Sequence, residues 1–157
     1  MKKNENFKTL SWEHHDGLVM SFRLQQGIKN NTNYKEMADY ILYTWNNLLE
    51  HHFWQEEHVL LKKKNNTNNL SKNISQMLDE HKQIRELISK IDNNNSKTKL
   101  IAEFAELLNK HIRFEERELF PLLQKESSAD DLEEIGKFLK QHHNHSCEVW
   151  PNQFWKN

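Results

Sequence analysis

The stretch His52–Leu61, HFWQEEHVLL, decides the fold, because the chain repeats it as His111–Phe120, HIRFEERELF. In both copies a histidine precedes a glutamate by four residues. Residues four apart lie on the same face of an α-helix. The sequence therefore predicts two helices, each of which presents one imidazole and one carboxylate on the same side.

Each copy is preceded by a segment that carries a further histidine. The first is Trp12–Leu18 (WEHHDGL) and the second is Leu78–Ile84 (LDEHKQI). Alignment of the two segments places His15 over His81, and an apolar residue follows each of them three positions later. His14 is adjacent and stays an alternative to His15. Together with the repeated pairs, these histidines give four imidazoles and two carboxylates, and we predict six metal ligands: His15, His52, Glu56, His81, His111 and Glu115.

Apolar residues recur at helical spacing on both sides of these ligands. They predict helices at 12–26, from the loop after Asn33 to about 62, 70–91, about 97–122 and about 129–143. Gly27 is expected to stop the first helix, Pro121 to kink or shorten the fourth, and Ser128-x-x-Asp131 to cap the fifth. The predicted fold class is all-α, an up-down antiparallel four-helix bundle with an additional C-terminal helix.

Composition agrees with this fold and limits the function. The 157 residues suit one domain, 1–157, with a core at about 10–124 and the extra C-terminal helix at about 129–146. A formal net charge of −1 argues against nucleic acid or an anionic membrane as partner. Cys147 is the single cysteine, which excludes an intrachain disulfide and a cysteine-based zinc site. The polar start of the chain and the lack of a long apolar run predict a cytoplasmic protein.

A metal explains the six predicted ligands together. Burial of an uncompensated carboxylate costs several kcal/mol, and lysine and arginine are nearly absent from the apolar stripes. Imidazole and carboxylate suit iron, manganese or zinc, and a carboxylate can bridge two ions. Two bridging glutamates and two histidines would give each ion about four protein donors, which leaves positions open for an external ligand.

The pattern resembles the hemerythrin-like proteins, also called the HHE cation-binding domain family, over about residues 10–124. The segment HIRFEERELFP, which begins at His111, is especially typical of that family. The resemblance implies a bundle around a non-haem di-iron centre, with two iron ions bridged by carboxylates and by an oxo or hydroxo group. It also implies a small-molecule ligand, either dioxygen, peroxide or nitric oxide.

Two departures set this chain apart from the oxygen-carrying hemerythrins. Those proteins have a second histidine on the third helix where this chain has Met77, and they have an aspartate five positions after the fourth-helix histidine. Here Glu115 follows His111 at four positions. With one imidazole fewer, redox turnover or sensing becomes more plausible than reversible oxygen carriage.

We therefore predict a di-iron protein that binds or reduces a small oxidant in oxidative stress or oxygen sensing. The alternative is an iron-storage, iron-delivery or metal-binding module without catalytic turnover, and whether the protein is an enzyme stays open at this point. A structural bundle with buried histidines, with zinc or without metal, is a third possibility. A second cluster, His142, His143 and His145 near Cys147, is weaker as a metal site because it follows a helix end.

Overall fold

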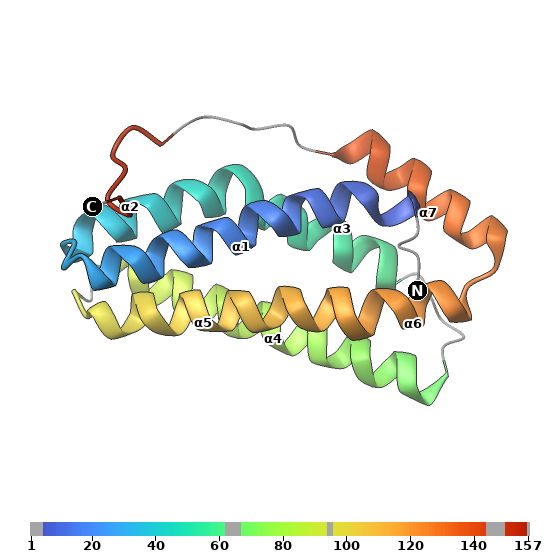
Figure 1. Cartoon of the computed structure of the whole chain (residues 1–157). Coiled ribbons are helices and arrows are strands. Elements are labelled where there is room, and N and C mark those ends of the chain that lie inside the picture. The colour runs from blue at the N-terminus through green and yellow to red at the C-terminus, as the bar shows by residue number, and fades with distance from the viewer. Residues whose placement is uncertain (1–4, 62–66, 94–95, 144–149, 157) are drawn as a thin grey trace.

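The computed structural model describes residues 5–61, 67–93, 96–143 and 150–156, and no strand occurs among them. Four helical rods run up and down in turn (Figure 1). The first is α1 (Lys8–Lys29), which follows a short 3₁₀ turn at Glu5–Phe7, and the third is α4 (Asn68–Asp92). The second joins α2 (Tyr34–Thr44) and α3 (Glu50–Leu61), the fourth joins α5 (Thr98–Phe114) and α6 (Phe120–Glu126), and α7 (Ala129–His142) lies outside the rods. The predicted all-α bundle with an extra C-terminal helix is confirmed.

The second rod and α4 bury the whole of their predicted stripes, whereas on the fourth rod Leu107 and Leu122 of the predicted stripe are only half-buried. On α4, every predicted position is buried, from Leu70 through His81 to Ile91, and the stripe packs against α5. The side chain of Thr67 caps the first turn of this helix by accepting a hydrogen bond from the backbone N–H of Leu70. The second rod also buries its stripe from Met37 to Val59. The spacing of apolar residues therefore sets the rotation of these rods.

The prediction for α1 is wrong. The helical spacing of Trp12, His15, Val19, Phe22 and Gln26 predicts that this stripe faces inward. Trp12 and Phe22 are 52 % and 58 % exposed, however, and the helix buries a face one residue away. Gly17 lies on that buried face, where an added Cβ atom would come 2.6 Å from Cδ1 of Ile112 on α5. The inner face of α1 is therefore not marked by large apolar residues alone. Gly27 does not end the helix either, since α1 continues to Lys29.

A five-residue π-helical segment interrupts each of the two rods that carry a His-x-x-x-Glu pair. The first is Trp45–Leu49, one turn before His52, and the second is Glu115–Leu119. A π segment inserts one residue into the helix and turns the following side chains relative to the preceding ones. The fourth rod then continues through Pro121 to Glu126 as one rod in Figure 1, so the predicted shortening at Pro121 is wrong.

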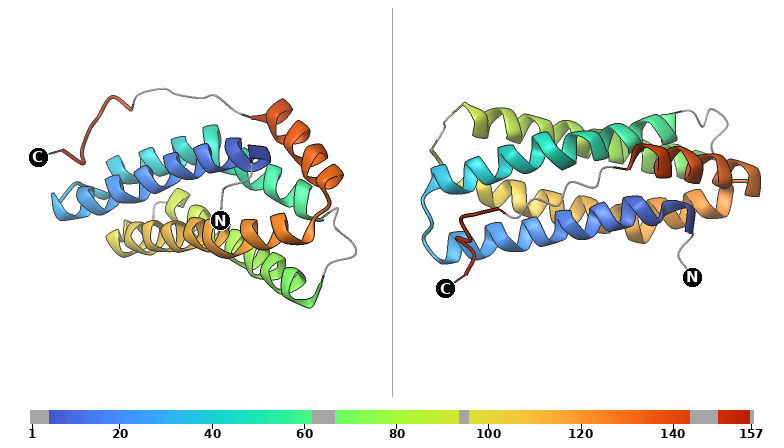
Figure 2. Two further views of the ribbon diagram at one scale, coloured as in Figure 1. Left: turned by 45° about the vertical axis from the view of Figure 1, so that its right-hand side comes forward. Right: turned by 90° about the horizontal axis from the view of Figure 1, so that it is seen from above.

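The C-terminal part of the chain covers two ends of the bundle. Ser128 caps α7 as predicted, accepting a hydrogen bond from the backbone N–H of Asp131, and α7 packs on the Glu5–Phe7 turn, α1 and α3. Residues 150–156 lie at the opposite end of the bundle (Figure 2), where the Phe154 ring packs at Gly27. The extra helix thus lies across one end of the bundle, as predicted.

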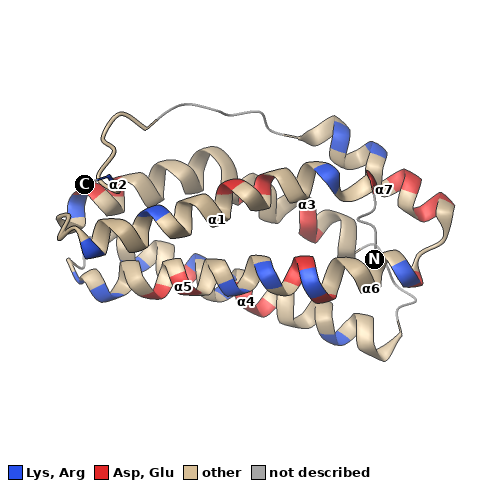
Figure 3. Cartoon of the chain, in the orientation of Figure 1, with Lys and Arg blue, Asp and Glu red and all other residues tan. Residues whose placement is uncertain are grey.

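The outer faces of the rods are polar. Figure 3 shows acidic and basic residues interspersed along the helices that face the viewer. No helix in the described part of the chain is both long and apolar enough to cross a membrane.

Candidate metal centre

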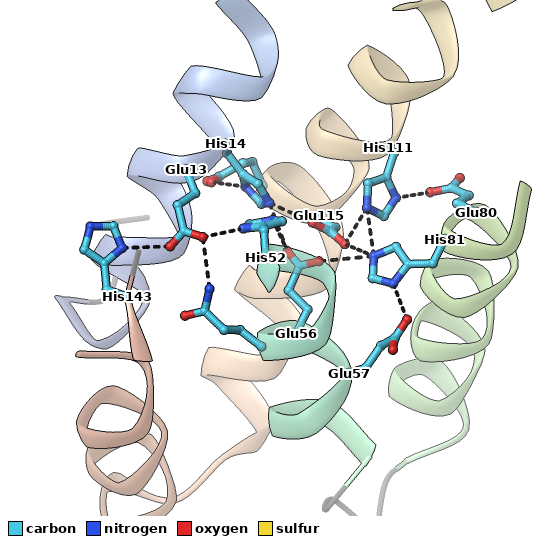
Figure 4. A network of polar contacts seen from close by, with 12 residues as sticks. Glu13, His14, His52, Glu56, Glu57, Glu80, His81, His111, Glu115 and His143 are labelled. Atoms are coloured by element: carbon cyan, nitrogen blue, oxygen red, sulfur yellow. Dashed lines mark hydrogen bonds and ion pairs between the residues drawn. The ribbon is translucent and has the colours of Figure 1, made fainter. Parts of the chain in front are cut away.

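Six histidine and glutamate side chains converge inside the bundle at the level of α3 and the second π segment (Figure 4). They come from all four rods, and none is more than 2 % exposed. The six are His14, His52, Glu56, His81, His111 and Glu115. Five of them were predicted from the sequence; their role as metal ligands stays a prediction.

The prediction that His15 faces the interior is wrong. Its side chain is exposed, and His14 lies in the centre instead. The physical reason is the rotation of α1, which turns the face with Gly17 rather than Leu18 toward α5. The alternative that the adjacent histidines left open is therefore the correct one for the placement.

The six side chains form two groups that share both carboxylates. The first group, here called the first metal position, is His14, His52, Glu56 and Glu115; the second metal position is Glu56, His81, His111 and Glu115. Within each group, one donor atom from every residue lies within 4.8 Å of the others, and each group could hold a metal ion. The centre is therefore built as a pair of adjoining sites.

The two oxygens of each shared carboxylate face different metal positions, one oxygen toward each. Glu56 places Oε1 at 2.8 Å from Nε2 of His52 and Oε2 at 3.1 Å from Nε2 of His81. Glu115 places Oε2 at 2.8 Å from Nε2 of His14 and Oε1 at 3.0 Å from Nε2 of His111. A carboxylate in this orientation can bridge two ions, one on each oxygen.

The donor atoms fit cations better than they fit one another. Nε2 of His81 and Nε2 of His111 lie 3.1 Å apart, about the separation of two nitrogens at right angles on one ion with bonds of ~2.1 Å. Both oxygens of Glu115 and Nε2 of His52 are buried and, among the described residues, lack a hydrogen-bond partner, although oppositely charged atoms approach them closely. The Glu115 oxygens are therefore available to a metal, and Nε2 of His52 becomes available when it loses its proton.

Four outer carboxylates accept hydrogen bonds from Nδ1 of the four inner histidines, and these pairs link each rod to the next around the bundle. In each pair, Nδ1 of a histidine donates to a glutamate on a neighbouring rod. The pairs are His52 with Glu13 at 3.2 Å, His81 with Glu57 at 2.9 Å, His111 with Glu80 at 2.9 Å and His14 with Glu116 at 2.7 Å. A proton fixed on Nδ1 leaves the Nε2 lone pair for an ion and orients the ring, which is how carboxylates support metal-bound histidines.

Three of the four outer carboxylates are predicted from the sequence, and one is not. Glu57 and Glu116 directly follow the predicted ligands Glu56 and Glu115, and Glu80 directly precedes His81, so the sequence offers all three as residues beside the ligands. Glu13 was missed, although the dipeptide Glu13-His14 matches Glu80-His81 in the repeat. That match is the signal that favours His14 over His15.

Aromatic rings close the centre on two sides. The ring of Phe53 stacks on His81 with centroids 3.8 Å apart and an interplanar angle of 5°, and Phe120 stacks on His14 at 5.3 Å. These phenylalanines exclude water from the imidazole faces and restrict how far the rings can rotate.

The inner histidines and glutamates shift one another's pKa values strongly. Burial by itself lowers the pKa of His52, but the Glu56 carboxylate and the hydrogen bond to Glu13 outweigh burial and raise this pKa to about 9. The pKa of His81 rises to about 10 in the same way, since burial is outweighed by Glu115, Glu56 and Glu57. Burial and the charge of Glu56 would raise the pKa of Glu115, but His111 and His14 lower it to about 2. In the metal-free centre these shifts favour an array of imidazolium ions at His52 and His81 and a carboxylate at Glu115.

Metal binding is expected to release protons, because an ion must displace the proton from Nε2 of each imidazolium. At pH 7, where His52 and His81 are protonated in the metal-free protein, two ions should release about two protons or more. Metal affinity should therefore increase as the pH rises toward 9–10. Titration calorimetry with Zn²⁺ in buffers of different ionisation enthalpy measures the number released. Release of no proton would contradict the imidazolium array, and His15→Leu should release the same number as the unaltered chain.

The second histidine cluster is divided by the structure. Nδ1 of His142 donates to the backbone carbonyl of Phe138 at 2.9 Å, whereas Nδ1 of His143 donates to Glu13 at 2.8 Å. His145 and Cys147 lie outside the described residues. His51 and His58 lie off the apolar stripe of their helix, which predicts a surface position, but both are half-buried beneath α7, where His58 stacks on Phe138.

Comparison with known proteins agrees with this geometry. The Hemerythrin HHE cation binding domain matches residues 8–123, which include all six inner side chains and the four outer carboxylates. Searches of curated proteins and of solved structures gave no match. The matched residues make up most of the chain, and the chain belongs to the family of the hemerythrin HHE cation-binding domain.

Proposed function

We propose that the protein is a non-haem di-iron protein that binds or reduces a small oxidant, namely dioxygen, peroxide or nitric oxide, in oxidative stress or oxygen sensing. The observation that carries this proposal is the sharing of Glu56 and Glu115, whose opposite oxygens face the two metal positions. Each position has two imidazoles and two carboxylate oxygens. These four protein donors leave vacancies on iron, which commonly takes about six.

The residues suit a reactive centre more than a structural one. An iron pair supplies electrons and vacant coordination positions when it is bound. Glu56 and Glu115 are the residues that would hold both ions, and the four outer carboxylates accept a hydrogen bond from Nδ1 of each histidine, which keeps a proton there. Phe53 and Phe120 limit the access of water.

The size of the ligand follows from the packing. All six inner side chains are at most 2 % exposed, and two surface grooves, one between α4 and α5 and one between α1 and α7, include none of them among their lining residues. A ligand of two or a few atoms fits this enclosure better than an organic substrate does.

The proposal predicts two irons per chain after anaerobic loading with Fe²⁺. On admission of air, near-ultraviolet absorption bands of a bridged ferric pair should develop, because the two carboxylates that the metal positions share would hold a pair of ions close together. Metal analysis and the absorption spectrum measure both results. One iron per chain, or two irons whose spectrum does not change in air, peroxide or nitric oxide, would refute the proposal.

A second candidate, iron storage or delivery without turnover, is supported by the outer carboxylates. Glu57, Glu80 and Glu116 are 15–23 % exposed and touch the inner histidines, so they could pass iron between the centre and solvent. Consumption of many equivalents of peroxide in the presence of a reductant would favour the oxidant-reducing protein. Rapid loss of iron to a chelator, with the fold unchanged and no turnover, would favour the carrier. The cytoplasmic location and the lack of nucleic-acid or membrane partners stay predictions.

A further inference from the structure

The residue that follows α7 contacts an outer carboxylate of the metal centre, although α7 and this residue lie outside the family match, which ends at residue 123. Nδ1 of His143, the residue that follows α7, donates to Oε2 of Glu13 at 2.8 Å. Oε1 of Glu13 accepts from Nδ1 of His52 at 3.2 Å, and Nε2 of His52 faces the first metal position. Figure 4 shows this row from His143 through Glu13 to His52.

Glu13 differs from the other three outer carboxylates in its surroundings. Its side chain is 1 % exposed, whereas Glu57, Glu80 and Glu116 are 15–23 % exposed and reach solvent. Besides His52, its donors are Nε2 of Gln55 at 3.0 Å and His143. A buried carboxylate depends on protein donors for its orientation, because water cannot take their place. His143 is the donor that holds Oε2.

The rest of α7 is anchored independently of this hydrogen bond. Leu132, Ile135 and Leu139 are buried, and the ring of Trp54 on α3 packs against Phe138 and His142. Loss of the His143 donor should therefore leave α7 folded while it releases Glu13.

We propose that His143 is a positioning residue that couples the docking of α7 to ion binding at the first metal position. The inference rests on the two-ion centre of the proposed function. By fixing Glu13, His143 fixes the ring of His52 in the orientation that binds an ion. The coupling is reciprocal: an ion on His52 orders Glu13 and thereby tightens the attachment of α7. Within the described ranges, the outer carboxylates of the second metal position, Glu57 and Glu80, accept hydrogen bonds from His81, Arg85 and His111 and from no residue of α7 or of its C-terminal end.

The test uses the full chain and Co²⁺ as the probe, in titrations followed by absorption. His143→Leu removes the donor and keeps an apolar side chain, whereas His143→Asn places an amide N–H near the position of Nδ1. We expect His143→Leu to weaken one of the two ions about fivefold to tenfold, with little change for the other, and His143→Asn to restore most of the loss. His15→Leu, the same change at an exposed histidine, is the matched control and should leave both affinities unchanged.

Hydrogen exchange measures the reverse effect, in which ion binding stabilises the attachment of α7. Co²⁺ should slow amide exchange in α7 of the unaltered chain and of His143→Asn, but not of His143→Leu. If His143→Leu binds both ions as tightly as the unaltered chain, or His143→Asn binds as weakly as His143→Leu, the coupling is refuted while the two-ion centre stands. If the unaltered chain binds fewer than two Co²⁺ ions, the two-ion centre of the proposed function fails first.

Discussion

Glu115→Gln is expected to reduce the metal content from two ions per chain to at most one and to weaken that ion by ~100-fold or more. The change preserves the size of the side chain but replaces one of its oxygens by an amide nitrogen, which does not bind metal in this setting. Since Oε1 faces His111 and Oε2 faces His14, either orientation of the amide removes a donor from one position. Metal analysis after anaerobic loading and gel filtration measures the effect. If Glu115→Gln keeps both ions, Glu115 does not bridge.

The adjacent histidines on α1 provide a matched pair for the same measurement. His14→Ala should lose the ion at the first metal position, because Nε2 of His14 lies 2.8 Å from Glu115 and 3.0 Å from Glu56. His15→Ala should retain two ions, because its side chain is exposed. The opposite result would mean that α1 is rotated by about one residue when metal is bound.

Removal of metal should have a large effect on stability. Two ions bound at concentrations ~1,000-fold above their dissociation constants add about 4 kcal/mol each to the free energy of unfolding, which for a chain of this size corresponds to a rise in Tm of about 15 °C or more. Thermal unfolding of chelator-treated and metal-loaded protein measures the difference. A Tm that does not respond to metal would favour the purely structural bundle.

The stability of the metal-free protein should fall above about pH 6.5, whereas the stabilisation by bound metal should increase. A raised histidine pKa stabilises the metal-free protein fully below the ordinary value of 6.5, and this contribution is lost as the pH rises toward the folded values of about 9 and 10 for His52 and His81. The lowered pKa of Glu115 stabilises above the ordinary value of 4.5 and loses its effect as the pH falls toward about 2. Metal-free protein should therefore be most stable between about pH 4.5 and 6.5. Metal binding strengthens above pH 6.5, so the difference in Tm between the two forms should widen up to about pH 9.

The sequence predicted those parts of the fold in which apolar residues and ligands follow one regular helical stripe. This holds for α4, where His81 is the polar member of a continuous apolar stripe, and for the pairs at His52 and His111. It fails for α1, because close packing against α5 requires Gly17, a residue that a search for apolar side chains passes over. Trp12 and Phe22 then suggested a face that the helix in fact exposes.

Two other features depend on contacts that no local pattern encodes. The two π segments, Trp45–Leu49 and Glu115–Leu119, lie within rods whose apolar spacing predicts an uninterrupted α-helix. The bond between His143 and Glu13 joins residues that are distant in the sequence and belong to different layers of the structure. Neither the π segments nor this hydrogen bond follows from a regular spacing of residues in the sequence.

The outer carboxylates, which link each rod to the next, also determine when in folding the metal centre can form. Glu13 with His52 and Glu80 with His111 lie within the N-terminal and C-terminal helical hairpins, but Glu57 with His81 and Glu116 with His14 connect one hairpin to the other. Neither hairpin alone supplies both carboxylate bridges or supports both of its histidines. A complete metal site therefore exists only after the two hairpins have packed together. Binding of both ions then indicates that the chain has completed folding.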